Sequence, residues 1–203
     1  MHVELLVEER SAEVAIRLLF PRIAGKQTTF AIHPFHGKDD LLAKLPSRLR
    51  AYREWVPEDW RIIVLIDEDR EDCLALKRTM EAAALGAGFA TRSSAGTGGH
   101  FVVLNRLAVE ELEAWFFGDV AAIATAYPRI PTTLDRQARY RDPDTIRGGT
   151  WEALEQVLQA SGYHKGGLPK VAAARAIAAH MDPDSNRSRS FCLFRDSLRE
   201  IVW

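Results

Sequence analysis

The chain has 203 residues, 47% of them hydrophobic, which is enough for one globular domain or one domain with a sizeable C-terminal addition. Its 27 basic and 28 acidic residues give a net charge of −1, which excludes a general electrostatic attraction to nucleic acid and leaves any such contact to local patches. The two cysteines, Cys73 and Cys192, lie far apart without metal-ligand spacing, as is typical of free thiols in a reducing compartment. The acidic N-terminus is not typical of a signal peptide, and no apolar run approaches the roughly 18–20 residues of a membrane helix. We therefore expect a soluble cytoplasmic protein without a membrane partner.

The first part of the chain alternates predicted strands and helices. Strands are expected at His2–Val7, Thr28–Phe35, Ile62–Ile66 and Phe101–Arg106, with a further short one at Phe89–Ser93. Between them we expect one helix capped by Ser11 and stopped at Gly25, one opened by Asp39 and kinked or split at Pro46, and one over Asp72–Ala87. This order predicts an α/β fold with a mostly parallel sheet flanked by helices.

The later part of the chain changes character. Residues 94–99 read as a flexible loop, and residues 127–149 as a long irregular connection rich in arginine and proline. Three helices are then expected, at Trp151–Ser161, Val171–His180 and Phe191–Trp203, with Asn186, Ser188 and Ser190 as caps of the last one. We therefore predict a core at residues 1–126 and a mainly helical C-terminal extension, packed on that core, at residues 127–203.

The central predicted strand runs directly into acids. The run Arg61–Asp72 reads R-I-I-V-L-I-D-E-D-R-E-D, and its apolar part suits a strand that is buried on both faces of a parallel sheet. In extended geometry Asp67 and Asp69 would point the same way, with Glu68 pointing elsewhere. In open α/β sheets, ligands bind at this end of the strands.

Two other acidic clusters also follow predicted strands. Glu8 and Glu9 come after the first strand, and Glu110, Glu111 and Glu113 come soon after the strand at Phe101–Arg106. The carboxyl ends of parallel strands lie at one edge, so the three clusters can converge on a shared site. Oxygen ligands without sulfur or histidine suit Mg²⁺ or Mn²⁺. The alternative is that each cluster only caps a helix, which is common for acids after strands.

The motifs resemble a known group of proteins. Toprim domains carry a Glu after the first strand and a D-x-D after the third, as Glu8 and Asp67–Asp69 do here. The chain is more similar to a bacterial domain-of-unknown-function family of the Toprim/OLD-type nuclease group. Its members share V-E-E-x-S, D-x-D-x-x-D, E-E-L-E-A-W and a late K-G-G…K stretch followed by N-x-S-x-S-F. These motifs stand here at Val7–Ser11, Asp67–Asp72, Glu110–Trp115 and from Lys165 to Phe191.

The resemblance implies roles for individual residues. Glu8, Asp67 and Asp69 would be metal ligands, and Asp72 and Glu113 would complete one or two sites for Mg²⁺ or Mn²⁺. Glu110 is an alternative to Glu113, because a helix would place the two a turn apart on one face. Many Toprim proteins have Gly where this chain has Glu9, which leaves open whether Glu8 alone or both acids face the metal. Lys165 and Lys170 would reach a phosphate or a leaving oxygen, or else belong to a solvated loop.

A local basic patch is the best candidate for contact with nucleic acid. The patch contains four arginines and an interleaved aromatic residue: Arg136, Arg139, Arg141, Arg147 and Tyr140. This combination suits contact with a nucleic-acid backbone and a base. The simpler interpretation is a solvated loop rich in arginine.

Three functions remain in competition. The first is a Mg²⁺-dependent nuclease, and the resemblance implies an anti-phage defence role with an ABC- or AAA-type ATPase as partner. The chain has no phosphate-binding G-x-x-x-x-G-K-[ST] loop, so it is not itself the nucleotide motor. The second is a catalytically silent module that binds an ATPase or a nucleic acid. The third, a receiver-like domain phosphorylated at Asp67, is disfavoured because no pair of aspartates follows the first strand.

Overall fold

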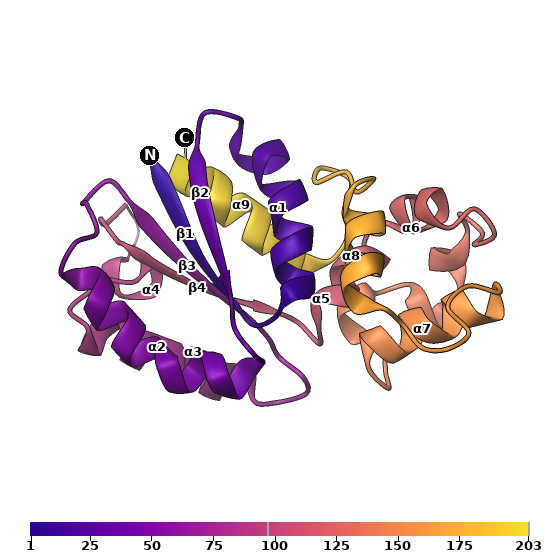
Figure 1. Ribbon diagram of the computed structural model, residues 1–203, viewed down its shortest axis with the longest axis horizontal. Helices are drawn as coiled ribbons and strands as arrows, with labels where there is room; N and C mark the ends of the chain where they lie inside the picture. The colour runs from indigo at the N-terminus through magenta and orange to yellow at the C-terminus, as the bar shows by residue number, and fades with distance from the viewer. Residues whose placement is uncertain (97, 203) are drawn as a thin grey trace.

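A parallel sheet forms the centre of the structure. The computed structural model describes residues 1–96 and 98–202, in which four strands pair in the order β2-β1-β3-β4, every pair parallel (Figure 1). These strands are β1 (His2–Val7), β2 (Thr29–Pro34), β3 (Arg61–Asp67) and β4 (Val103–Ala108). The predicted α/β class with a parallel sheet is therefore confirmed.

Helices cover both faces of the sheet. Helices α1 (Arg10–Ala24) and α9 (Arg189–Val202) pack on one face, and α2 (Lys38–Arg53) and α3 (Cys73–Gly86) pack on the other (Figure 1). Alternate residues of each inner strand enter the two cores, so Ile63 packs with α1 whereas Val64 packs with α2 and α3. All five residues Ile62–Ile66 are buried, which is why this strand is apolar on both faces. No helix in the described part of the chain combines the length and the apolar character needed to cross a bilayer.

A helical lobe lies beyond the carboxyl ends of the strands, at the right of Figure 1. Its helices are α5 (Leu112–Phe117), α6 (Val120–Ala126), α7 (Thr150–Ala160) and α8 (Lys170–Ala178). The irregular connection predicted over residues 127–149 contains three single-turn helices, η1 (Leu134–Arg136), η2 (Ala138–Tyr140) and η3 (Pro143–Thr145). Helix α8 packs on α1, and α9 returns to contact β4, so residues from both ends of the chain share one hydrophobic core.

Hydrogen bonds of Asn186 and Ser188 fix the start of α9. As predicted, Ser188 caps α9, because its Oγ accepts a hydrogen bond from Phe191 N at 3.2 Å. Ser190 lies inside the helix instead of capping it, and Asn186 Oδ1 accepts from Ser188 N at 2.9 Å. Asn186 Nδ2 also donates to the Trp115 carbonyl at 2.7 Å. A Cβ on Gly118 would stand 2.1 Å from Asn186 Oδ1, so this close approach requires glycine at residue 118.

Four local predictions were wrong. Ser11 does not cap α1, because the helix begins at Arg10, Glu9 holds the N-cap position and the Ser11 hydroxyl donates to the Glu9 carboxylate. Helix α2 runs from Lys38 to Arg53 through Pro46, so the predicted split there was wrong. Instead of a strand at Phe89–Ser93, Thr91 forms a single bridge to Val103 and then caps a short helix, α4 (Arg92–Ala95). Strand β4 consequently lies two residues later than expected. Thr97 of the predicted loop and Trp203 of the last predicted helix lie outside the described residues.

Candidate metal centre

The ends of β1 and β3 bring Glu8 beside Asp67. The two strands are paired with Val7 opposite Leu65, so the residues that follow them lie side by side. Glu8 Oε2 accepts a 3.0 Å hydrogen bond from the backbone amide of Asp67. The first two acidic clusters of the sequence therefore meet at one edge of the sheet.

Several carboxylates act on Asp67. Burial raises the pKa of Asp67 well above its ordinary value, and the negative charges of four acids raise it further: Glu8, Glu113, Asp69 and Glu9. The pKa of Glu8 is also raised, by burial first and by Asp69 and Glu9, although the Asp67 amide and Lys38 oppose the shift. Like charges held this close favour a proton or a cation between them. We call Glu8, Asp67, Asp69 and Glu113 the carboxylate cluster.

Glu113 is the most deeply buried member of this cluster. Its side chain is in α5, the residue is 1% exposed, and its Oε2 has no hydrogen-bond partner among the described residues. Burial raises the pKa of Glu113 to about 7, with Glu111 and Glu9 adding to the shift and Lys170 opposing it. An unpartnered buried carboxylate oxygen costs stability, and a bound ion, a water molecule or a catalytic role would account for it.

Lys170 faces the carboxylate cluster, whereas Lys165 does not contact it. Lys170 is the first residue of α8, and its ammonium lies 5.2 Å from the ring centre of Trp151. Burial alone would lower the pKa of Lys170, but the carboxylates of Glu113, Glu9, Glu111 and Asp67 raise it. Lys165 is exposed in the preceding loop, and within the described residues it forms no ion pair with these acids.

Two pairs of acids are not aligned as predicted. Strand β3 ends at Asp67, and Asp69 has a left-handed backbone with φ of 51°, so strand alternation does not align the two aspartates. Glu110 has φ of 59° and precedes α5, so it does not share a helical face with Glu113. Instead, the Glu110 carbonyl accepts from the amide of Asp69 at 2.8 Å, and its own amide donates to Glu68 Oε2 at 3.2 Å. These bonds tie the turns after β3 and β4 together.

Two further acids serve as helix caps. Asp72 Oδ1 accepts from the amides of Leu74 and Ala75 at the start of α3, and its side chain is 62% exposed. Glu111 Oε2 accepts from the amides of Thr150 and Trp151 at 2.8 and 2.9 Å, which fixes the start of α7. The capping interpretation of the acidic clusters thus holds for these two residues.

Lys38 is a site residue that the sequence analysis missed. It is the first residue of α2, its side chain is 7% exposed, and its ammonium contacts Asp69 Oδ2 at 2.9 Å and Glu71 Oε1 at 2.8 Å. It also donates to the Glu68 carbonyl at 3.1 Å. The one available signal was its position after β2, because the end of β2 lies at the same edge as the ends of β1 and β3.

The donor set fits a hard divalent cation. The groups that meet at this edge are carboxylates with one unpartnered buried oxygen, a chemistry suited to Mg²⁺ or Mn²⁺. Across residues 1–96 and 98–202, no three acidic, histidine or cysteine side chains are arranged as they stand to hold a metal ion. Side chains of the carboxylate cluster would therefore have to turn toward a bound ion.

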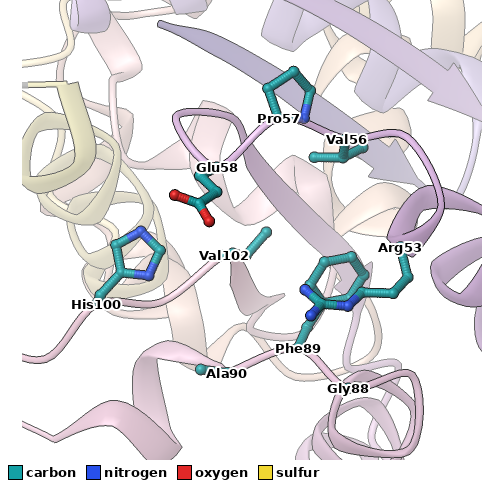
Figure 2. A pocket seen from close by; sticks show the side chains of 9 residues that line it. All are labelled: Arg53, Val56, Pro57, Glu58, Gly88, Phe89, Ala90, His100 and Val102. Atoms are coloured by element: carbon teal, nitrogen blue, oxygen red, sulfur yellow. The ribbon is translucent and has the colours of Figure 1, made fainter.

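A different pocket lies at the opposite edge, where β3 and β4 begin. It measures about 380 Å³, and Figure 2 shows Arg53, Glu58, Phe89 and His100 around it. The Arg53 guanidinium carbon lies 5.5 Å from the ring centre of Phe89. This pocket contains no member of the carboxylate cluster, so it is separate from the candidate metal centre.

Comparisons with known proteins agree with this architecture. No curated protein matches the sequence. Among solved structures, the chain is similar to the C-terminal region of the Xanthomonas campestris pv. campestris OLD protein, with a TM-score of 0.53 and 14% identity over 98% of this chain and 95% of the other. At that identity the similarity concerns the fold alone. Residues 7–199 match the family described as "Domain of unknown function (DUF4276)", and the chain therefore belongs to that family.

Proposed function

We propose that this protein is a Mg²⁺- or Mn²⁺-dependent, Toprim-like nuclease that hydrolyses phosphodiester bonds. The observation that carries the proposal is the meeting of Glu8, Asp67 and Glu113 with Lys170 at one end of a parallel sheet. The fold shared with the OLD protein's C-terminal region and the sequence motifs support the Toprim-like assignment.

Each residue of the centre has a distinct proposed task. Glu8, Asp67 and Glu113 would hold the cation, and Asp69 would join them after leaving its ion pair with Lys38. A bound divalent cation would supply charge stabilisation for phosphoryl transfer and activate water. Lys170 carries a positive charge, and the neighbouring carboxylates favour that charge. It would therefore attract the phosphodiester and stabilise negative charge on its oxygens.

The partner and the biological role rest on the sequence resemblance. We propose an anti-phage defence effector that works with an ABC- or AAA-type ATPase supplied by another chain. The G-x-x-x-x-G-K-[ST] motif is missing from this sequence, so nucleotide-driven motion would have to come from such a partner.

The alternative is a catalytically silent module, and one observation favours it. Lys38 already neutralises Asp69 in the described structure, so part of the cluster's charge is compensated without a metal. In that case the protein would bind an ATPase or a nucleic acid without cutting.

The test compares cleavage with metal binding. Plasmid DNA and RNA are incubated with the protein in Mg²⁺, in Mn²⁺ and in EDTA, beside Asp67→Asn and Lys170→Gln. We expect metal-dependent cutting that both variants lose, with Mn²⁺ binding by calorimetry lost in Asp67→Asn and kept in Lys170→Gln. Cutting that persists in EDTA or in Asp67→Asn would contradict the proposal, and Mn²⁺ binding without cutting, also with the ATPase present, would favour the silent module.

A further inference from the structure

The connection before α7 exposes a set of arginines. Residues 127–149 contain five arginines and three aspartates, and every one of the arginines is exposed. We define the arginine segment as residues 136–147, which carry Arg136, Arg139, Arg141 and Arg147. Arg136 ends η1, Arg139 lies in η2, and Arg141 is the C-cap residue of η2, whereas Arg147 follows η3 by two residues.

The acids of this region turn toward the protein. Asp135 Oδ2 pairs with Arg187 at 3.2 Å, and Asp142 caps η3 by accepting from Asp144 N at 3.3 Å. Asp144 accepts from the Ser188 hydroxyl at 2.7 Å and from Arg189 N at 2.5 Å, which occupies it at the start of α9. The outward charge of the arginine segment is therefore more positive than its composition indicates.

Two of the arginines share a hollow. A depression of about 400 Å³ is lined by Arg139 and Arg147 together with Ala138 and Thr145. No carboxylate lines it among the described residues. Arg139 Nη1 also donates to Gln156 Oε1 at 3.0 Å. Two guanidinium groups around one hollow without an acid to neutralise them suit an anion such as a phosphate, which arginine can bind in a bidentate manner.

The aromatic residue of the segment is not available for stacking on a base. Tyr140 is 7% exposed, and its ring stacks on Phe117 with the centres 5.2 Å apart and the planes 3° from parallel. The base contact considered for Tyr140 is therefore not supported. Contact with a nucleic acid at the arginine segment would then be made through phosphates, which carry no sequence information.

The arginine segment is anchored to the helix that carries Glu113. Tyr140 of η2 stacks on Phe117 of α5, and η3 also packs against α5. Phe117 follows Glu113 by four residues, about 6 Å along the helix axis and on the same face. The arginine segment and Glu113 are therefore connected through one short helix, α5.

We propose that the arginine segment binds the phosphodiester backbone of a nucleic acid beside the carboxylate cluster. The identity of the ligand rests on the proposed nuclease function. The inference adds a second surface, which binds the part of the nucleic acid next to the bond that is cut. Binding is non-specific in sequence and strongly dependent on salt, because it is made by arginine–phosphate pairs.

The experiment measures binding without cutting. Anisotropy of labelled duplex DNA, single-stranded DNA and duplex RNA is titrated with Asp67→Asn protein at several salt concentrations. Arg139→Gln/Arg147→Gln is compared with Arg50→Gln/Arg78→Gln, a control that removes the same charge from exposed positions of α2 and α3. We expect the segment variant to lose about two units of the slope of log K against log salt, and the control to lose none. Arg139→Lys/Arg147→Lys should keep the slope, and circular dichroism checks the fold of each protein.

The outcomes separate the inference from the proposed function. Loss of slope on any of the three probes supports the segment, and the probe with the steepest slope identifies the source of the phosphates. Equal slopes for the segment and control variants would overturn the inference even if the wild-type protein cuts nucleic acid. Conversely, segment-dependent binding by a protein that never cuts would leave the inference standing and remove the nuclease.

Discussion

The backbone amide of Asp67 donates its hydrogen bond to the side chain of Glu8, across 3.0 Å. This bond holds the half-buried Glu8 carboxylate beside Asp67. Burial and the charges of neighbouring acids raise the pKa of both side chains. The ends of β1 and β3 are thus stabilised by geometry and destabilised by charge, as is common where a site is built for a ligand at the expense of stability.

Replacing the Glu8 carboxylate should therefore raise stability and abolish metal binding. Glu8→Gln keeps an oxygen that can accept from the Asp67 amide but removes the charge, so we expect a higher Tm than wild type at pH 8 in EDTA. Glu8→Ala leaves that amide without its partner, at a cost of about 1–3 kcal/mol, and should melt below Glu8→Gln. Thermal melts with and without Mn²⁺ test this. A Mn²⁺-induced rise in Tm that survives in Glu8→Gln would remove Glu8 from the ligand set.

Lys38 should hold the turn after β3. Lys38→Met keeps most of the buried stem but leaves Asp69, Glu71 and the Glu68 carbonyl without their shared donor. We expect a loss of about 1–3 kcal/mol of unfolding free energy, measured by urea denaturation in EDTA. Lys44→Met is the matched control, because within the described residues that exposed lysine pairs with Asp40, one helical turn away, and such exposed pairs contribute little to stability. Equal losses for the two variants would show that Lys38 does not position the turn.

The stability of the metal-free protein should fall as pH rises. The pKa of Glu113 is about 7 in the folded state, against 4.5 as its ordinary value, so the folded state binds more protons between these values. The stabilisation is complete below pH 4.5 and is lost as pH rises through about 7. For this buried side chain the difference amounts to about 3 kcal/mol. In EDTA, Glu113→Gln should melt above wild type at pH 8 and approach it near pH 5.

Mn²⁺ should reverse that trend. The cation requires ionised carboxylates, so its stabilising effect should increase as pH rises through the pKa of Glu113. Without metal, the contradicting outcome is an equal change of Tm with pH in the wild-type protein and in Glu113→Gln. That result would show that Glu113 is ionised in the folded state.

Gly118 should tolerate no side chain. A Cβ there would lie 2.1 Å from Asn186 Oδ1 and 2.8 Å from Ser188 N, so Gly118→Ala must displace these two residues, whose hydrogen bonds fix the start of α9. Overpacking of this kind costs about 1–3 kcal/mol, which is about 2–4 °C of Tm per kcal/mol for a chain of this length. Gly86→Ala is the control, since nothing lies within 4 Å of its Cβ in α3, and alanine there should be neutral or stabilising. A similar Tm for both variants would contradict the close approach.

Local sequence patterns predicted the main elements well. Strand β1 has the predicted bounds, and β2 and β3 each differ from their predictions by one residue at each end, because apolar runs bounded by turn residues specify strands locally. No end was predicted for the helix expected at the E-E-L-E-A-W motif, and the break between α5 and α6 at Gly118 was not foreseen. It depends on contacts with Asn186 and Arg187, nearly seventy residues later in the chain, which local propensity does not contain.

The candidate site was also predicted in part by the sequence and decided in part by contacts between distant segments. By itself, the sequence determined that acids follow β1 and β3 and lie near the end of β4. The alternation of strands and helices also indicated a parallel sheet, in which these strand ends meet at one edge. Only the tertiary structure decided which acids are buried in the cluster and which cap helices. Asp67 and Glu113 are surrounded by other acids, whereas Asp72 and Glu111 each accept hydrogen bonds from the amides of a helix start. Lys38 likewise enters the site from a different strand end, because burial and charge pairing arise from contacts between segments that are distant in the chain.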